Sequence, residues 1–137
     1  MVREESGSSI ERFIRNELGC QCPDAVLRHI ELEACPDAFG YWPQGRLIRV
    51  GGRLLILVLN SDDSAGLCRT LPDLFDAGRR ARDARAYNRF RLVIATSCPD
   101  ALGPALMQRF ESLTGSDERM HLHVLAREHV PAMFEHA

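Results

Sequence analysis

The sequence predicts a single α/β domain in which helices pack on a mixed five-stranded sheet. The expected elements follow the order helix, strand, strand, strand, helix, strand, helix, strand, which is typical of an antiparallel hairpin fused to a parallel β-α-β-α-β unit. A chain of 137 residues, 45% hydrophobic and 26% charged, also has the size and composition of one globular domain. We therefore expect one domain over residues 1–137, with a flexible N-terminus over residues 1–8.

The first half of the chain supplies the N-terminal helix and the hairpin. Apolar residues recur at helical spacing over residues 10–18, which predicts an amphipathic helix that ends at Gly19. Apolar and polar residues alternate in "HIELEA", residues 29–34, and predict a strand with one solvent-exposed face. The pair Gly51 and Gly52 separates two β-rich runs and predicts a hairpin turn.

The second half supplies the parallel part of the sheet. Residues 54–59 are apolar without alternation, as expected of a strand covered on both faces. A helical pattern covers residues 62–87, and Pro72 is expected to kink or split that helix. "FRLVIA" and "MHLHVLA" predict two more strands, separated by a helix that is capped by Gly115.

Charge and composition restrict the classes of partner. The formal net charge is -2, so the charge balance gives no support to a nucleic-acid partner. The start, "MVREESGSSIERF", is charged and polar, so we expect neither a signal peptide nor a membrane anchor, and we predict a cytoplasmic protein. The partners that stay open are another protein, a small ligand or a second copy of the chain.

The tetrapeptide "CPDA" occurs three times, at residues 22–25, 35–38 and 98–101. Proline is favoured at the first position of a helix, and an acidic residue beside it suits the positive end of the helix dipole. We therefore interpret CPDA as a helix-start signal with cysteine at the cap. The alternative is a chemical role, because a helix N-terminus also stabilises a thiolate.

Cysteines are the candidate metal ligands, and four of them are considered: Cys20, Cys22, Cys35 and Cys98. Their spacing matches no familiar zinc or iron-sulfur module. The predicted topology places Cys35 and Cys98 at the carboxyl edge of the sheet, with the other two about 20 Å away at the opposite edge. We predict no cofactor; the alternative is a redox or metal-binding protein, with zinc or an iron-sulfur cluster, centred on Cys20 and Cys22. Cys68 is interpreted as a core residue.

Polar residues converge at the predicted carboxyl edge, where open parallel sheets bind their ligands. They follow the third, fourth and fifth strands: Asn60, Asp62, Asp63, Ser97, Cys98, Arg127 and His129. Under the alternative interpretation, the acidic and hydroxyl residues among them only cap helices and shape turns. A nucleophile and base, Cys98 with His129, are conceivable, but nothing in the sequence fixes their distance, so catalysis stays open.

Three further features have two interpretations each. The loop aromatics Phe39, Tyr41 and Trp42 form a lid or interface anchor, or they fold back to cover one end of the sheet. His121 and His123 share a strand face at a spacing that can bind zinc, but no third ligand is evident, and we favour the interpretation that they lie on a solvent-exposed edge strand. The six arginines of residues 79–91 form a solvated helix face, or they bind an anionic partner.

These observations predict a small cytoplasmic binding or accessory module. It would recognise a partner protein or a small ligand at the carboxyl edge, under the aromatic loop that contains Trp42.

Overall fold

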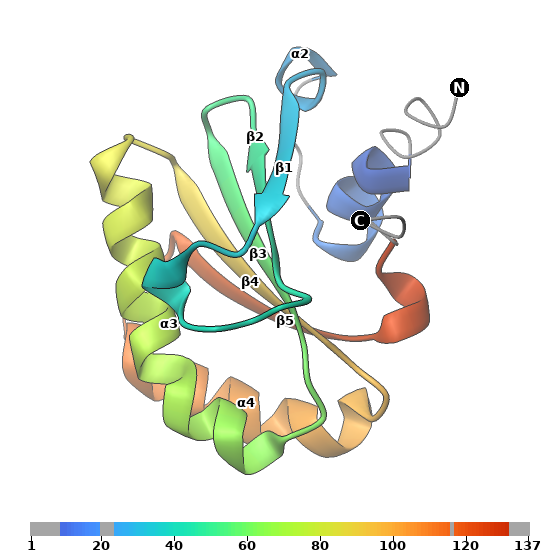
Figure 1. Cartoon of the computed structure of the whole chain (residues 1–137), viewed down its shortest axis with the longest axis vertical. Helices are drawn as coiled ribbons and strands as arrows, with labels where there is room; N and C mark the ends of the chain where they lie inside the picture. The colour runs from blue at the N-terminus through green and yellow to red at the C-terminus, as the bar shows by residue number, and fades with distance from the viewer. Residues whose placement is uncertain (1–8, 20–23, 116, 132–137) are drawn as a thin grey trace.

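The computed structural model describes residues 9–19, 24–115 and 117–131, and it confirms the predicted α/β fold. Within these residues one sheet has the strand order β1-β2-β3-β4-β5 (Figure 1). The strands are β1 (Ile30–Ala34), β2 (Arg46–Val50), β3 (Leu54–Asn60), β4 (Arg89–Thr96) and β5 (Met120–Ala126). Strands β1 to β3 pair antiparallel and β3 to β5 pair parallel, so β1, β3, β4 and β5 end at the same edge. The expected flexible N-terminus lies outside the described residues.

The hairpin between β2 and β3 turns at the predicted glycine pair. Gly51 and Gly52 have φ angles of 54° and 68°, which side-chain-bearing residues rarely adopt. The amide of Gly51 also donates to the carbonyl of His29 at 2.8 Å, and a Cβ atom there would lie 2.6 Å from Cγ1 of Val26. Gly51 is thus required by both its backbone angle and its surroundings.

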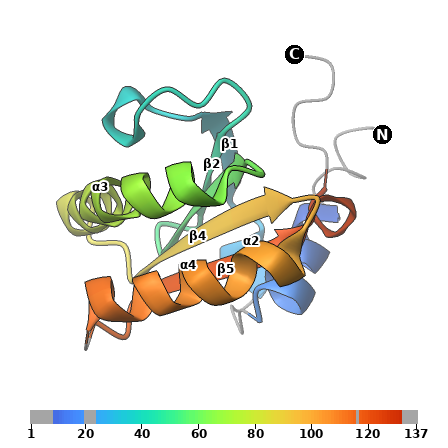
Figure 2. The ribbon, with the colours of Figure 1, turned by 90° about the horizontal axis from the view of Figure 1, so that it is seen from below.

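Helices α3 (Ser64–Ala84) and α4 (Pro99–Thr114) cover one face of the sheet (Figure 2). Their buried residues, Leu71 and Leu74 among them, form one core cluster with Phe90 of β4. Pro72 was expected to kink or split the helix predicted over residues 62–87. It does not split the helix, because α3 runs through Pro72 without interruption. The kinked alternative fits better, since α3 changes direction along its length in Figure 2.

The N-terminal helix covers the opposite face of the sheet. It occupies residues 9–17, and its last turn is the π-helix η1 (Phe13–Glu17). Phe13 and Ile14 are buried and belong to a second core cluster that includes Ile56 of β3. Gly19 has φ 69°, the left-handed conformation that the sequence predicts after this helix. No helix of the described ranges has both the length and the apolar composition needed to cross a membrane.

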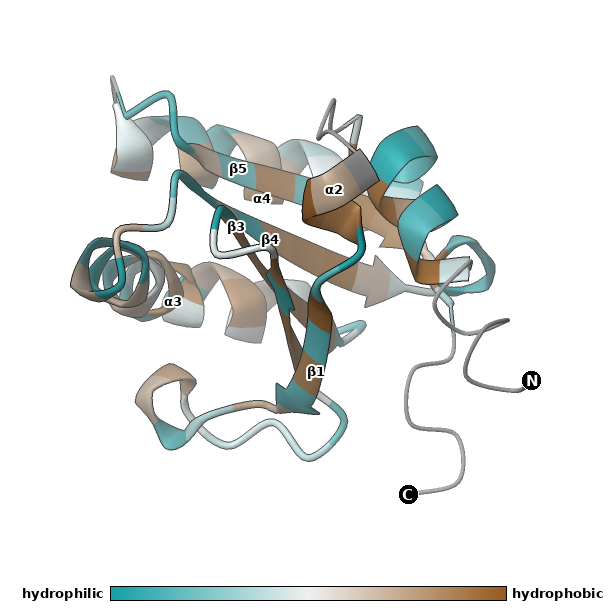
Figure 3. Cartoon of the chain, turned by 90° about the horizontal axis from the view of Figure 1, so that it is seen from above, coloured by the Kyte–Doolittle hydropathy of each residue, from teal (hydrophilic) through white to brown (hydrophobic). Residues whose placement is uncertain are grey.

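The exposed and buried strands differ in their hydropathy as predicted. Figure 3 shows hydrophobic and hydrophilic residues alternating along β1, and burial there alternates in part as well. In β3, by contrast, every residue from Leu54 to Leu59 is buried. The helices on both faces explain this difference, because they cover the centre of the sheet.

A helical turn begins within each CPDA copy, as a helix-start signal predicts. The expected cysteine cap, however, is found only at the third of the described copies, because Pro36 is the cap residue at the second. The turns are α2 (Asp24–Leu27), the 3-10 helix η2 (Asp37–Phe39) and α4, which begins at Pro99. At the third copy, Cys98 occupies the cap position, but its thiol makes no capping hydrogen bond. Its backbone carbonyl instead accepts from the amides of Ala101 and Leu102, each at 3.1 Å. The cysteine at this position therefore caps through its backbone alone.

Candidate functional site

The predicted carboxyl-edge cluster forms around Asp62, in the connection between β3 and α3. Its Oδ1 accepts from Oγ1 of Thr96 at 2.7 Å and from the amide of Ser97 at 2.9 Å. Its Oδ2 accepts from Oγ of Ser97 at 2.9 Å, and Arg127 pairs with the carboxylate at 3.1 Å. The amide and hydroxyl donors of residues 96 and 97, and then Arg127, lower the pKa of Asp62 to about 2. Five donor atoms, including both Nη atoms of Arg127, therefore contact this carboxylate. Asp62 thus holds the edge together and has little capacity left for a ligand.

Four other predicted edge residues lie in four different places. Asp63 caps α3 by accepting from the amide of Gly66 at 3.0 Å, as the capping interpretation expects. Asn60 borders a small pocket of about 120 Å³ together with Trp42. His129 borders a pocket of about 390 Å³ beside the N-terminal helix, in the 3-10 helix η3 (Arg127–His129). Cys98 lies near Thr96, with its Sγ atom 3.7 Å from Oγ1 of Thr96. No hydrogen bond joins Cys98 to His129, so catalysis by this pair stays a prediction.

The described cysteines are embedded in apolar surroundings. Cys35, Cys68 and Cys98 are free, half-buried and packed against the core cluster under α3 and α4. Burial, and secondarily the charge of Asp37, raises the pKa of the Cys35 thiol to about 11, which is the opposite of thiolate activation. Cys20 and Cys22 lie outside the described residues, so the thiol alternative centred on them stays a prediction. Among the residues that are described, no group of three potential ligands is placed to hold a metal ion.

The aromatic loop between β1 and β2 divides between the two interpretations. Phe39 is buried and stacks on Phe90 of β4, with ring centroids 6.0 Å apart and an interplanar angle of 5°. Trp42 is half-buried, and its Nε1 donates to the carbonyl of Phe39 at 2.8 Å. Tyr41 is 89% exposed, and among the described residues no other large hydrophobic side chain is exposed. The loop therefore covers the sheet with one aromatic side chain and presents another to solvent.

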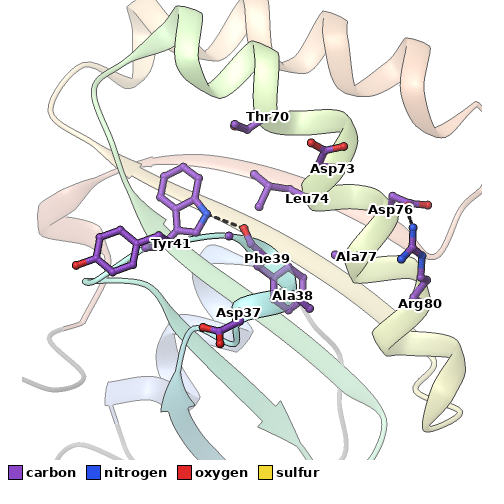
Figure 4. Close-up of a pocket in the computed structure, with 12 residues that line it drawn as sticks. Asp37, Ala38, Phe39, Tyr41, Thr70, Asp73, Leu74, Asp76, Ala77 and Arg80 are labelled. Carbon is purple, nitrogen blue, oxygen red and sulfur yellow. Dashed lines mark hydrogen bonds and ion pairs between the residues drawn. The ribbon is translucent and has the colours of Figure 1, made fainter.

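A pocket of about 520 Å³ lies between this loop and α3 (Figure 4). Residues 37–42 form one wall, and the other wall comes from α3: Thr70, Asp73, Leu74, Asp76, Ala77 and Arg80. In Figure 4, Leu74 points from α3 toward the loop and Tyr41 projects away from the helix. We call this feature the loop–α3 pocket.

The loop–α3 pocket is acidic and partly aromatic. Three carboxylates border it, Asp37, Asp73 and Asp76, against the single guanidinium of Arg80. Asp76 forms an ion pair with Arg80. The side chains of Asp37 and Asp73 are exposed, and neither makes a hydrogen bond or an ion pair with another described residue. Two carboxylates beside exposed aromatic surface favour a ligand with a positive charge.

Of the residues predicted to bind a ligand at the carboxyl edge, Trp42 alone borders this pocket. The other two loop aromatics, Phe39 and Tyr41, which the sequence suggested as a lid or interface anchor, border it as well. The acidic residues of α3 were visible in the sequence at positions 73 and 76, with Arg80 one turn further on, so all three lie along one side of a helix. What the sequence did not show is the path of the loop, which brings residues 37–42 against that side.

Comparison of the chain with protein-family models, with curated proteins and with solved structures finds no match.

Proposed function

We propose that this chain is a binding module that recognises a basic side chain of a partner protein in the loop–α3 pocket. The observation that carries the proposal is the exposed Tyr41 beside a pocket bordered by Asp37 and Asp73, two carboxylates with no hydrogen bond or ion pair to another described residue. A guanidinium or ammonium group of the partner can pair with these carboxylates. Tyr41, which projects away from α3, can contact neighbouring residues of the same partner.

The magnitudes favour a protein partner over a small cation. An exposed ion pair contributes about 0 to 1 kcal/mol, and an exposed cation–π contact contributes about 0.5 to 1 kcal/mol. Two such pairs and one such contact sum to about 2 to 3 kcal/mol at most, whereas even a millimolar ligand needs about 4 kcal/mol. A physiological ligand must therefore bury further surface, and Tyr41 is placed to contact it.

The pocket is held open by its own structure. Phe39 anchors the loop in the core, and the hydrogen bond from Trp42 to the carbonyl of Phe39 fixes the loop's backbone. A recognition loop that is ordered before binding does not lose that conformational entropy when the partner arrives. The proposal therefore places an exposed recognition residue on a rigid support.

Tryptophan fluorescence provides the test, since Trp42 is the single tryptophan of the chain and borders the pocket. The peptide Gly-Arg-Leu-Arg-Gly should give a saturable change in fluorescence. The matched peptide Gly-Gln-Leu-Gln-Gly should bind about fivefold more weakly, because it lacks the charge.

Variants locate the effect. Asp73→Asn should weaken binding of the arginine peptide by about threefold, and Glu111→Gln, an exposed carboxylate change on α4 outside the pocket, should leave it unchanged. Equal affinity for the two peptides, or equal effects of the two variants, would contradict the proposal.

A further inference from the structure

Two arginines of β4 and two histidines of β5 lie together on the sheet face that the N-terminal helix packs against. Nη1 of Arg89 lies 2.9 Å from Nε2 of His121, and Nη1 of Arg91 lies 3.0 Å from Nε2 of His123. Nη1 of Arg91 also donates to the carbonyl of Leu18, at the end of the N-terminal helix, at 3.1 Å. We call these four side chains the arginine–histidine cluster.

The hydrogen bonds of the cluster determine the state of the histidines. A guanidinium group has donors and no acceptor, so Nε2 of each ring must accept and carry no proton. Each neutral ring then keeps its proton on Nδ1. Burial, followed by the positive charge of Arg91, lowers the pKa values of His121 and His123 to about 4, which agrees with neutral rings. The positive charge of the cluster therefore comes from Arg89 and Arg91.

These two guanidinium groups have no carboxylate partner in residues 9–19, 24–115 and 117–131. Arg91 is 8% exposed, and its buried Nε has no hydrogen-bond partner among those residues. The default expectation of a solvated arginine face is therefore wrong for Arg91. It is also wrong for Arg82, which is 4% exposed. Buried charges are normally paired, because desolvation without a counter-charge is costly.

The nearest negative groups do not neutralise the cluster. Asp117, before β5, acts on His121, but its oxygens accept from Arg79 at 3.5 Å and from Arg82 at 3.1 Å. The carbonyl of Leu18 lies at the C-terminus of the N-terminal helix, where the helix dipole is equivalent to about half a negative charge. Nη1 of Arg89 also donates to the carbonyl of Glu118 at 2.9 Å, which is a neutral acceptor. Within the described part of the chain, the two guanidinium groups therefore have carbonyl partners but no carboxylate that balances their charge.

We propose that the arginine–histidine cluster binds a phosphoryl group. A phosphate monoester carries about 1.5 to 2 negative charges at neutral pH, which matches two guanidinium groups better than a single carboxylate does. Arg89 lies on β4 and His121 on the neighbouring edge strand β5. Both side chains are half-buried, so a ligand can reach them. The neutral rings add Nδ1–H donors to the guanidinium donors.

This site is independent of the loop–α3 pocket. Arg91 and Val93 alternate with Phe90 and Leu92 along β4, and Phe90 belongs to the core cluster under α3, while Val93 belongs to the cluster under the N-terminal helix. The two sites thus lie on opposite faces of the sheet, so one can fail a test while the other passes.

The experiment is a titration of the full chain with inorganic phosphate, with a phosphoserine peptide and its unphosphorylated form, and with adenosine monophosphate. Binding is followed by calorimetry, and the histidine ring signals are followed by NMR as a function of pH. Saturable binding should accompany a rise in the pKa values of His121 and His123, because a bound anion offsets the charge of the arginines.

Variants complete the test. Arg89→Gln should weaken phosphate binding by at least about tenfold, because it removes a charge-assisted donor. Arg85→Gln, at the exposed end of α3, should leave phosphate binding unchanged. Arg91→Gln is a weaker test, because Arg91 is buried and also bonds to Leu18; Arg89→Gln avoids that problem.

The outcomes are distinct. Tightest binding of the phosphoserine peptide would identify a phosphorylated protein as the source of the group, and equal binding of all three phosphorylated probes would identify the phosphoryl group alone. Absence of saturable binding for every phosphorylated probe would overturn the proposal. An equal loss of affinity in Arg85→Gln and Arg89→Gln would overturn it too, since the attraction would then be nonspecific.

Discussion

The carboxylate of Asp62 accepts hydrogen bonds from both the backbone amide and the side-chain hydroxyl of Ser97, each at 2.9 Å and across 35 residues of sequence. The contact joins the β3–α3 connection to the β4–α4 connection. The sequence suggested that these segments converge at the carboxyl edge, and the structure shows that their convergence consists of this internal hydrogen bonding.

The first prediction concerns the pH dependence of that contact. The folded-state pKa of Asp62, about 2, lies below the ordinary value of an aspartate, so its stabilising effect is complete above about pH 4 and is lost as the pH falls toward 2. In urea unfolding, the difference in free energy of unfolding between the parent and Asp62→Asn should narrow over that interval. A difference that stays constant from pH 5 to pH 2 would contradict the proposed role of the carboxylate.

The hairpin glycines provide a matched pair of variants. Gly52→Ala should cost about 1 kcal/mol, because alanine must adopt a positive φ, while a Cβ at this position meets no atom within 4 Å. Gly51→Ala should cost more, since its Cβ would also lie 2.8 Å from the carbonyl oxygen of Val26. Denaturant midpoints measure both costs. Equal destabilisation by the two variants would contradict the close approach of Val26 to Gly51.

Phe39 and Tyr41 should separate stability from recognition. Phe39→Ala should lower the free energy of unfolding by about 3 kcal/mol, because Phe39 is buried against Phe90. Tyr41→Ala should change the free energy of unfolding by less than about 0.5 kcal/mol, since the side chain is 89% exposed. The same variant should weaken binding of the arginine peptide. A large loss of stability in Tyr41→Ala would mean that this residue is structural.

Cys35 should react slowly with alkylating reagents at neutral pH. Only the thiolate reacts, and burial with the charge of Asp37 raises the pKa of Cys35 to about 11. Alkylation by iodoacetamide, followed by peptide mapping, should therefore still accelerate between pH 9 and pH 10 in the folded protein. The same peptide in denaturant serves as the control and should level off at lower pH. A folded-state plateau below pH 9 would contradict the raised pKa of Cys35 and favour a chemical role for the cysteine of this CPDA copy.

The sheet could be predicted because its signals are local. The uninterrupted apolar run of β3 and the glycine pair before it depend only on neighbouring residues, and so does the helix start at each CPDA copy. The continuity of α3 through Pro72 could not be predicted in this way. Residues on both sides of the proline, Leu71 and Leu74, are buried in the same core, and this packing offsets the lost hydrogen bond.

The sites depend on contacts between distant segments, which a single sequence does not show. Arg91 meets the carbonyl of Leu18 across 73 residues, so its burial depends on where the N-terminal helix packs. The loop–α3 pocket similarly requires Tyr41 and Asp73 to border one space from separate elements. The sequence named the aromatic loop as a candidate, but it gave no indication of which helix the loop would face.

NMR chemical-shift mapping of the arginine peptide on isotope-labelled protein tests the central claim most directly. The account predicts that the largest shifts occur at the backbone amides of Gly40 and Tyr41, at the Trp42 indole and at Asp73 and Ala77, all of which border the loop–α3 pocket. It also predicts that Tyr41→Ala reduces these shifts at a fixed, non-saturating peptide concentration, while the rest of the spectrum stays unchanged. Largest shifts at the carboxyl edge around Asp62 and Ser97, or no localised shifts at all, would contradict recognition in this pocket.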